Sequence, residues 1–206
     1  MNATAAFSFH YDFPRNYEIK LLDSCSLANP AEELHQFPAR LEEGDRSGIY
    51  LRVTSPGLPS WIGFFAKGFD SNQVASGIYS CPDPGSLCVV VGGYAYVVDT
   101  GNPQRWLQIE QRPVVQVKPL PDLKLLLFAG FTSISGLGES GRLWTTERLS
   151  WEGISIGAVK DGVLHGQGWD LMTDKEVPFE VDLITGESKG GAQPQAIMEH
   201  GDKPPS

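Results

Sequence analysis

A long succession of short apolar segments, each ending at a glycine, proline or Asp/Asn turn, is the feature that most restricts the fold of this chain. Such segments occupy residues 49–54, 61–66, 76–80, 87–91, 94–99, 114–118 and 123–129. Most are rich in β-branched or aromatic residues, and this length and composition are typical of strands rather than helices. The 23 glycines and 15 prolines among 206 residues supply the turns that so many strands need.

Two of the turns carry the residues that a tight hairpin requires. Gly92 and Gly93 separate two valine-rich segments, and an Asp161-Gly162 pair separates two further apolar segments. The commonest two-residue hairpin turn needs a positive φ at both central positions, which glycine adopts at little steric cost. We therefore expect antiparallel hairpins at both places.

The N-terminal region begins with an aromatic alternation. Phe7, Phe9, Tyr11 and Phe13 alternate with polar residues, which is the period of a strand with one aromatic face. We expect this face to pack on the core. The alternative is an exposed edge strand that pairs with a partner, including a second copy of the chain in a homodimer.

One short helix is expected in the same region. Asn29 offers an N-cap, Pro30 suits the first helical position, and Glu32 places a carboxylate near the positive helix end. These signals predict a helix from about Asn29 to Gln36, with one further turn at residues 41–43.

The C-terminal region shows a final alternating segment followed by a loss of pattern. Apolar residues alternate with Glu, Pro and Asp over residues 176–183, and Pro178 favours a sheet edge because proline donates no ladder hydrogen bond. Residues 191–206 have little to bury, so a flexible tail is expected. The expected domains are an N-terminal region at 1–46, a main β domain at 47–190 and the tail.

Two stretches of the chain repeat one pattern of strand, glycine turn, strand, turn and tryptophan. The first runs from Cys88 to Trp106 and the second from Leu125 to Trp144, while residues 182–186 repeat only the turn. These phrases resemble blades of β-propellers, especially quinoprotein-like blades with a D-x-x-T-G turn, over about 100 residues. Four blades would consume about 160 residues. The expected fold is therefore all-β, an antiparallel meander forming a β-sandwich or strongly bent sheet, with a small or partial propeller as the alternative.

A second resemblance rests on the segments at 148–153, 166–170, 177–182 and 185–186. These segments resemble a small group of uncharacterised soluble bacterial proteins. The resemblance implies a bacterial, cytosolic, all-β protein and implies nothing about mechanism.

The charge balance and the hydropathy pattern exclude several classes of partner. The formal net charge of −9 would repel phosphate backbones, and no basic stripe interrupts the chain, so nucleic-acid binding is not expected. A cationic protein partner is compatible with this charge. No apolar run approaches the roughly 18 residues of a spanning helix, and no signal peptide is recognised at the N-terminus, so we expect a cytoplasmic protein without membrane contact.

The sequence gives little support for covalent catalysis, for a metal site or for a cofactor site. Cys25, Cys81 and Cys88 read as free buried thiols, although Cys81 and Cys88 could face each other across a hairpin. Residues 136–141 match G-x-G-x-x-G, but a strand-like segment follows where a dinucleotide site needs a helix. The four histidines form no metal-binding pair. We expect no cofactor and no metal.

The densest polar and aromatic cluster lies at residues 151–176, and the candidate binding residues come from it. His165, Gln167 and Trp169 share one strand face, with small glycines on the reverse, and Trp151 lies nearby in sequence. A face bearing His, Gln and Trp is less apolar than a core face should be. The sequence therefore predicts a ligand platform made of Trp151, His165, Gln167 and Trp169, and a solvated sheet face with one structural tryptophan is the alternative.

Three functions follow from these residues. The favoured one is a non-enzymatic binding module whose acidic, Trp-bearing sheet face holds a protein partner or a polar small ligand. The first alternative is a hydrolase that uses His165 with Asp170 or Asp174 as acid and base. The second is an immunity-like inhibitor of a basic partner, suggested by the charge alone.

Overall fold

The computed structural model describes residues 7–23, 32–40 and 47–192. The described chain forms seventeen strands and one short 3-10 helix, η1 (Pro121–Leu123), and the strands make four sheets. The all-β expectation is confirmed. None of the described helices is long and apolar enough to cross a membrane.

Apart from residues 9–10, which belong to the second sheet, the four sheets follow one another along the chain. The first sheet has the order β2-β4-β5-β3, made of β2 (Glu18–Leu22), β4 (Gly48–Thr54), β5 (Trp61–Ala66) and β3 (Glu33–Phe37). The second has the order β1-β6-β7-β8-β9, made of β1 (Phe9–His10), β6 (Gly77–Ser80), β7 (Ser86–Val91), β8 (Tyr94–Asp99) and β9 (Trp106–Gln108). The third and fourth sheets are antiparallel meanders in chain order. They are β10 (Gln116–Leu120), β11 (Leu125–Ala129), β12 (Ile134–Gly138) and β13 (Leu143–Thr145), then β14 (Ile154–Lys160), β15 (Val163–Asp170), β16 (Lys175–Asp182) and β17 (Ser188–Gly190).

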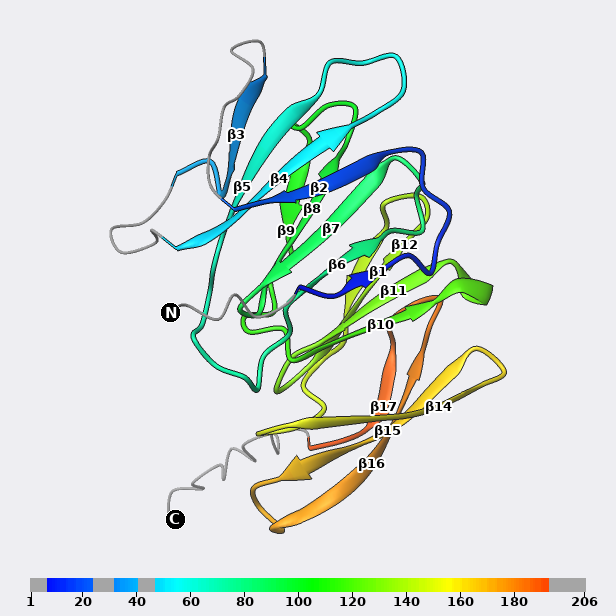
Figure 1. Cartoon of the computed structure of the whole chain (residues 1–206). Coiled ribbons are helices and arrows are strands. Elements are labelled where there is room, and N and C mark those ends of the chain that lie inside the picture. The colour runs from blue at the N-terminus through cyan, green and yellow to red at the C-terminus, as the bar shows by residue number, and fades with distance from the viewer. Residues whose placement is uncertain (1–6, 24–31, 41–46, 193–206) are drawn as a thin grey trace, which may run out of the picture.

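Each sheet packs face to face on the next, and the first and fourth sheets lie at opposite ends of the series (Figure 1). Three clusters of buried hydrophobic residues join the first sheet to the second, the second to the third, and the third to the fourth. Among the described residues no such cluster joins the fourth sheet back to the first. The molecule is therefore an open series of sandwich-like contacts, as a partial propeller would be.

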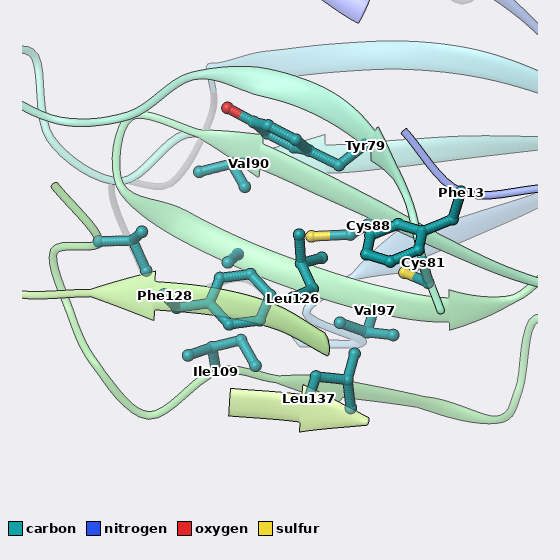
Figure 2. Packing of buried hydrophobic residues seen from close by; sticks show 12 residues of the cluster. Phe13, Tyr79, Cys81, Cys88, Val90, Val97, Ile109, Leu126, Phe128 and Leu137 are labelled. Carbon is teal, nitrogen blue, oxygen red and sulfur yellow. The ribbon is translucent and has the colours of Figure 1, made fainter. Parts of the chain in front are cut away.

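The strands in the middle of the series bury both faces. In β7, Leu87 and Val89 contact the first sheet, whereas Cys88 and Val90 contact the third. In β11, neighbouring leucines likewise belong to two different clusters. Figure 2 shows the cluster between the second and third sheets, where Phe128 and Leu126 lie against side chains from β7 and β8. Continuous apolar runs such as these are what a strand covered on both faces requires.

Both predicted hairpin turns are confirmed. Gly92 and Gly93 connect β7 to β8 with φ values of 57° and 78°, and Asp161 and Gly162 connect β14 to β15 with φ values of 51° and 78°. Both turns therefore have a positive φ at each central residue, as the hairpin argument requires. The chain pairs tightly at these points because the turn conformation matches the twist of the flanking strands.

The internal repeat is also confirmed as structure. Its two copies correspond to β7-β8-β9 and β11-β12-β13, and the tryptophans fall in the last strand of each. In the second copy Trp144 packs so closely on Gly136 that a Cβ there would lie 2.3 Å from the indole ring. The glycine-rich segment thus forms β12 and its turn, which explains the G-x-G-x-x-G match without a nucleotide.

The helix expected from about Asn29 to Gln36 is wrong where the structure describes it. Residues 33–37 form β3, which runs parallel to β5. Glu32 does not cap a helix. Its carboxylate accepts hydrogen bonds from Arg52 Nε at 2.6 Å and Nη2 at 2.8 Å, and from Ser60 Oγ at 2.8 Å. Long-range pairing with β5 and β4 therefore overrides the local capping pattern. Residues 29–31 and 41–43 lie outside the described residues.

The aromatic alternation at the N-terminus does not give one packed face. The regular strand β1 is only two residues long and pairs with the edge of the second sheet, parallel to β6. Phe13 is buried in the cluster between the second and third sheets, but Phe9 and Tyr11 are 43% and 44% exposed. Because the chain leaves the sheet after His10, the period of two is lost. The alternative of an exposed edge describes β1 better.

Pro178 does not lie at a sheet edge, since β16 has β15 on one side and β17 on the other. Its carbonyl accepts a hydrogen bond from Gly191 N at 2.9 Å, and β17 pairs only with Phe179–Val181. The N and O atoms of one strand residue point to the same side. The nitrogen of Pro178, which carries no proton, therefore faces the end of β17. Its lack of an N–H removes no hydrogen bond between β16 and β15.

The predicted tail and domain borders are described only in part. Ala192 is buried and its N–H donates to Leu149 O at 2.9 Å, so the first residues beyond Gly190 contact the segment that connects the third and fourth sheets. Residues 193–206 lie outside the described residues, and the division at 46 and 190 stays a prediction. Cys81 and Cys88 are free, buried thiols, as expected, and Cys25 lies outside the described residues.

The packing of Trp144 on Gly136 gives a test of the third sheet. Gly136→Ala should lower the free energy of unfolding by about 1–3 kcal/mol, because the added methyl overpacks the indole ring. Gly138→Ala in the same strand is the matched control, since its Cβ would meet nothing closer than 3.8 Å, and should change stability by less than about 0.5 kcal/mol. Urea unfolding monitored by tryptophan fluorescence measures both. Equal effects in the two variants would contradict this packing.

The Glu32–Arg52 pair gives a test by pH. The hydrogen bond from Arg52, and then that from Ser60, hold the pKa of Glu32 below its ordinary value of 4.5. A depressed pKa contributes stability above the ordinary value and loses it as Glu32 becomes protonated at lower pH. The stability difference between the wild type and Glu32→Gln should therefore be largest near neutral pH and should shrink below about pH 4.5. A difference that does not change with pH, measured by urea unfolding, would contradict this role.

Candidate functional site

The outer face of the fourth sheet carries three of the four residues that the sequence suggested for a ligand platform. Leu164 of β15 and Phe179 of β16 point into the core toward the third sheet. Alternate residues of β15 therefore point away from that core, and His165, Gln167 and Trp169 share the outer face with their cross-strand neighbours on β16. The core side of β15 holds Gly166 and Gly168, which lie close to Phe179 and to Leu149. We use "outer face" below for the exposed side of β14–β17.

His165 contacts a different carboxylate from the ones that the sequence nominated. It lies directly opposite Glu180, and its Nδ1 is 3.5 Å from Glu180 Oε1. Both side chains are about half exposed. Asp170 lies five residues further along β15, about 16 Å away at the usual strand rise. His165 and Glu180 therefore form a solvated cross-strand contact.

Asp170 and Asp174 organise the turn between β15 and β16. Asp170 Oδ2 accepts a hydrogen bond from Thr173 Oγ1 at 2.7 Å. Asp174 has a φ of 52°, and its Oδ1 accepts a hydrogen bond from Trp169 Nε1 at 3.2 Å. One carboxylate thus fixes the turn and the other fixes the indole ring.

Ser150 joins the two tryptophans and was not singled out from the sequence. Its fully buried hydroxyl donates to Gly153 O at 2.6 Å and accepts from Trp169 N at 2.9 Å, while Trp151 N donates to Trp169 O at 3.0 Å. Arg148 lies over the Trp151 ring with 4.5 Å between its Cζ atom and the ring centroid. No local pattern marks a serine with this role, because Trp169 lies on a strand 19 residues away.

An acidic groove adjoins the outer face at its β17 end. It encloses about 550 Å³ and is lined by four carboxylates and one lysine, namely Glu147, Glu180, Asp182, Glu187 and Lys189, with small polar residues between them. Asp182 is held in place because its Oδ1 accepts from Ile184 N and Thr185 N at 2.8 and 2.9 Å. These hydrogen bonds, that from Thr185 first, lower the pKa of Asp182, so it is ionised at neutral pH.

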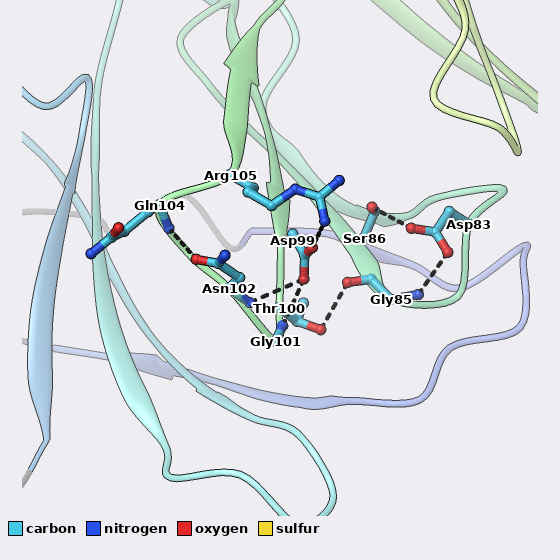
Figure 3. A network of polar contacts seen from close by, with 9 residues as sticks. All are labelled: Asp83, Gly85, Ser86, Asp99, Thr100, Gly101, Asn102, Gln104 and Arg105. Carbon is cyan, nitrogen blue, oxygen red and sulfur yellow. Dashed lines mark hydrogen bonds and ion pairs between the residues drawn. The ribbon is translucent and has the colours of Figure 1, made fainter.

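A second polar region, in the β6–β7 and β8–β9 turns of the second sheet, consists of turn-stabilising contacts. Figure 3 shows Asp99 accepting from Gly101 N and Asn102 N, and Asp83 accepting from Ser86 Oγ. Arg105 approaches Asp99 at 3.5 Å. The adjoining cavity of about 520 Å³ is lined partly by Cys81, but burial raises the pKa of this thiol well above its ordinary value. Its thiolate is therefore scarce at neutral pH, and this thiol is not an activated nucleophile.

No group of three or more His, Cys, Asp or Glu side chains within the described ranges could hold a metal ion. Asp170 and Asp174, considered above for a hydrolase, are joined by hydrogen bonds to the turn and to Trp169 instead. What the described site can do chemically is present an indole ring and several carboxylates to a ligand.

Comparisons with known proteins give no family. No family model matches the chain, and no curated protein matches it. Among solved structures, the N-terminal domain of Nup159 matches with a TM-score of 0.34 and 14% identity over 95% of this chain and 57% of that one. A chain in the Saccharomyces cerevisiae complex of Dbp5 with Nup159, Gle1, IP6 and ADP matches with a TM-score of 0.34 and 12% identity, over 94% of this chain and 56% of that one. This chain thus spans just over half the length of both, and at these TM-scores no conclusion rests on the likeness.

The Ser150 contacts give a test of the platform. Ser150→Ala should lower the free energy of unfolding by about 1–3 kcal/mol, because the N–H of Trp169 loses its buried acceptor. The variant should also move the indole N–H resonance of Trp169 in an amide correlation spectrum. The exposed Ser155→Ala on β14 is the control and should change neither quantity. An unchanged Trp169 resonance in Ser150→Ala would contradict the role given to the hydroxyl.

Proposed function

We propose that this protein is a non-enzymatic interaction module that binds a positively charged protein partner through the outer face of β14–β17 and the acidic groove beside it. The observation that carries the proposal is the concentration of exposed carboxylates on one sheet face next to an accessible tryptophan. Glu176 and Glu180 point outward from β16, and Glu187 lines the groove. Complementary charge would steer a basic partner to this face.

The site supports binding better than hydrolysis. An activated nucleophile needs a base that a third group orients, whereas His165 is 45% exposed and its Nδ1 lies 3.5 Å from Oε1 of Glu180, which is 54% exposed. An immunity-like inhibitor of a basic protein would be one case of the proposed function. A homodimer through the N-terminal strand is a separate prediction, supported by the exposed Phe9 and Tyr11 at the edge of the second sheet.

The proposal is tested by neutralising three carboxylates of this face. The triple variant Glu176→Gln, Glu180→Gln and Glu187→Gln should bind a capped decalysine peptide about tenfold more weakly than the wild type in calorimetric titrations. The estimate allows a few tenths to 1 kcal/mol for each exposed pair. The loss should become smaller as salt is added, since salt screens exposed charges.

The control has the same net charge but keeps the outer face. Glu18→Gln, Glu110→Gln and Asp122→Asn also remove three exposed carboxylates, so either triple variant changes the formal charge from −9 to −6. This control should bind decalysine nearly as well as the wild type. Equal weakening in both triples would show that only the overall field attracts the peptide, and the proposal would then be wrong.

A further inference from the structure

Four aromatic rings of the described chain already lie beside an arginine. Arg15 lies 4.2 Å from the ring centroid of Tyr11 and 5.9 Å from that of Tyr17, Arg112 lies 5.8 Å from that of Tyr94, and Arg148 lies 4.5 Å from that of Trp151. Trp169 is half-buried on the outer face, and no Lys or Arg side chain of the described chain lies over it.

The surroundings of Trp169 are negative. Its indole N–H donates to Asp174 Oδ1 at 3.2 Å, and Glu176 lies directly opposite Trp169 on β16. A hydrogen bond to a carboxylate raises the electron density of the indole, because the negative acceptor polarises the N–H bond. A more negative ring face attracts a cation more strongly. The ring and both carboxylates therefore favour the same kind of ligand.

The ring is held before any ligand arrives. The backbone N–H of Trp169 donates to the buried Ser150 hydroxyl, and the backbone carbonyl of Trp169 accepts a hydrogen bond from Trp151 N. Asp170 fixes the adjoining turn through Thr173, which also positions Asp174. A preorganised site loses little conformational entropy on binding.

The same turn also offers apolar contact. Leu171 and Met172 follow β15 directly and are 53% and 66% exposed. Long cationic side chains bury their methylene stems along apolar surface while the charged head stays polar. The turn thus supplies a surface for the stem next to a ring and carboxylates for the head.

We infer that Trp169, Asp174 and Glu176 bind a single arginine side chain of the partner, which lies flat on the indole ring. Arginine is favoured over lysine because a planar guanidinium stacks on an aromatic face while its edge donates to carboxylates, whereas an ammonium is a compact, strongly hydrated charge. This inference rests on the proposed function, since it names the side chain that the acidic face would recognise.

The experiment titrates the whole chain with capped pentaarginine and follows the indole N–H resonances, with Trp169→Phe identifying the resonance of Trp169. Pentaarginine should shift this resonance and bind about three- to fivefold more tightly than pentalysine. Asp174→Asn keeps an acceptor for the indole but removes the charge, and it should abolish the preference for arginine. Asp122→Asn, which removes one exposed carboxylate from η1 and leaves the outer face intact, is the charge-matched control and should retain it.

Each outcome separates this inference from the proposed function. If pentaarginine shifts the amides of His165 and Lys189 but leaves the Trp169 indole unmoved, the acidic face binds cations and the Trp169 site is wrong. Equal affinities for the two peptides in the wild type would also overturn the arginine assignment. If neither peptide shifts any resonance of β14–β17, the proposed function fails as well.

Discussion

The structure depends on the burial of both faces of the strands in its middle sheets. In β7 and β11 every second side chain contacts one neighbouring sheet and the residues between them contact the other. A shift of register by one residue would exchange the two sets of side chains and misfit both interfaces at once. The tight turn at Gly92 and Gly93 meets the same requirement, because it holds β7 and β8 in the register on which both clusters depend.

This arrangement also determines which sheet faces are free. Within the described residues, both faces of the second and third sheets are packed on neighbouring sheets, so a free sheet face is found at the ends of the series. At the fourth sheet the inner side of β15 is small, with Gly166 and Gly168 close to core atoms. The large and polar side chains, His165 and Trp169 among them, therefore lie on the outer side. The candidate site therefore lies on this outer side because the fourth sheet is the last sheet of the series.

Two groups of carboxylates in this acidic protein have different consequences. Asp99 and Asp182 accept backbone hydrogen bonds in turns, where an ionised oxygen satisfies N–H groups that no strand pairs. The carboxylates of Glu176 and Glu187 are exposed and accept no hydrogen bond within the described chain. The first group stabilises the turns, and the second creates the electric field that a basic partner would meet.

Patterns in the amino-acid sequence predict the β class, the two hairpins, the repeated blade-like unit and the strand face shared by His165, Gln167 and Trp169. All of these follow from short-range periodicity and from the turn conformations that glycine permits. The three-dimensional structure was needed to show that residues 33–37 form a strand, that Phe9 and Tyr11 are exposed, and that Ser150 joins two tryptophans. These outcomes depend on partners far away in the chain, such as β5 for β3 and β15 for Ser150, and no local pattern encodes which distant strand becomes a neighbour.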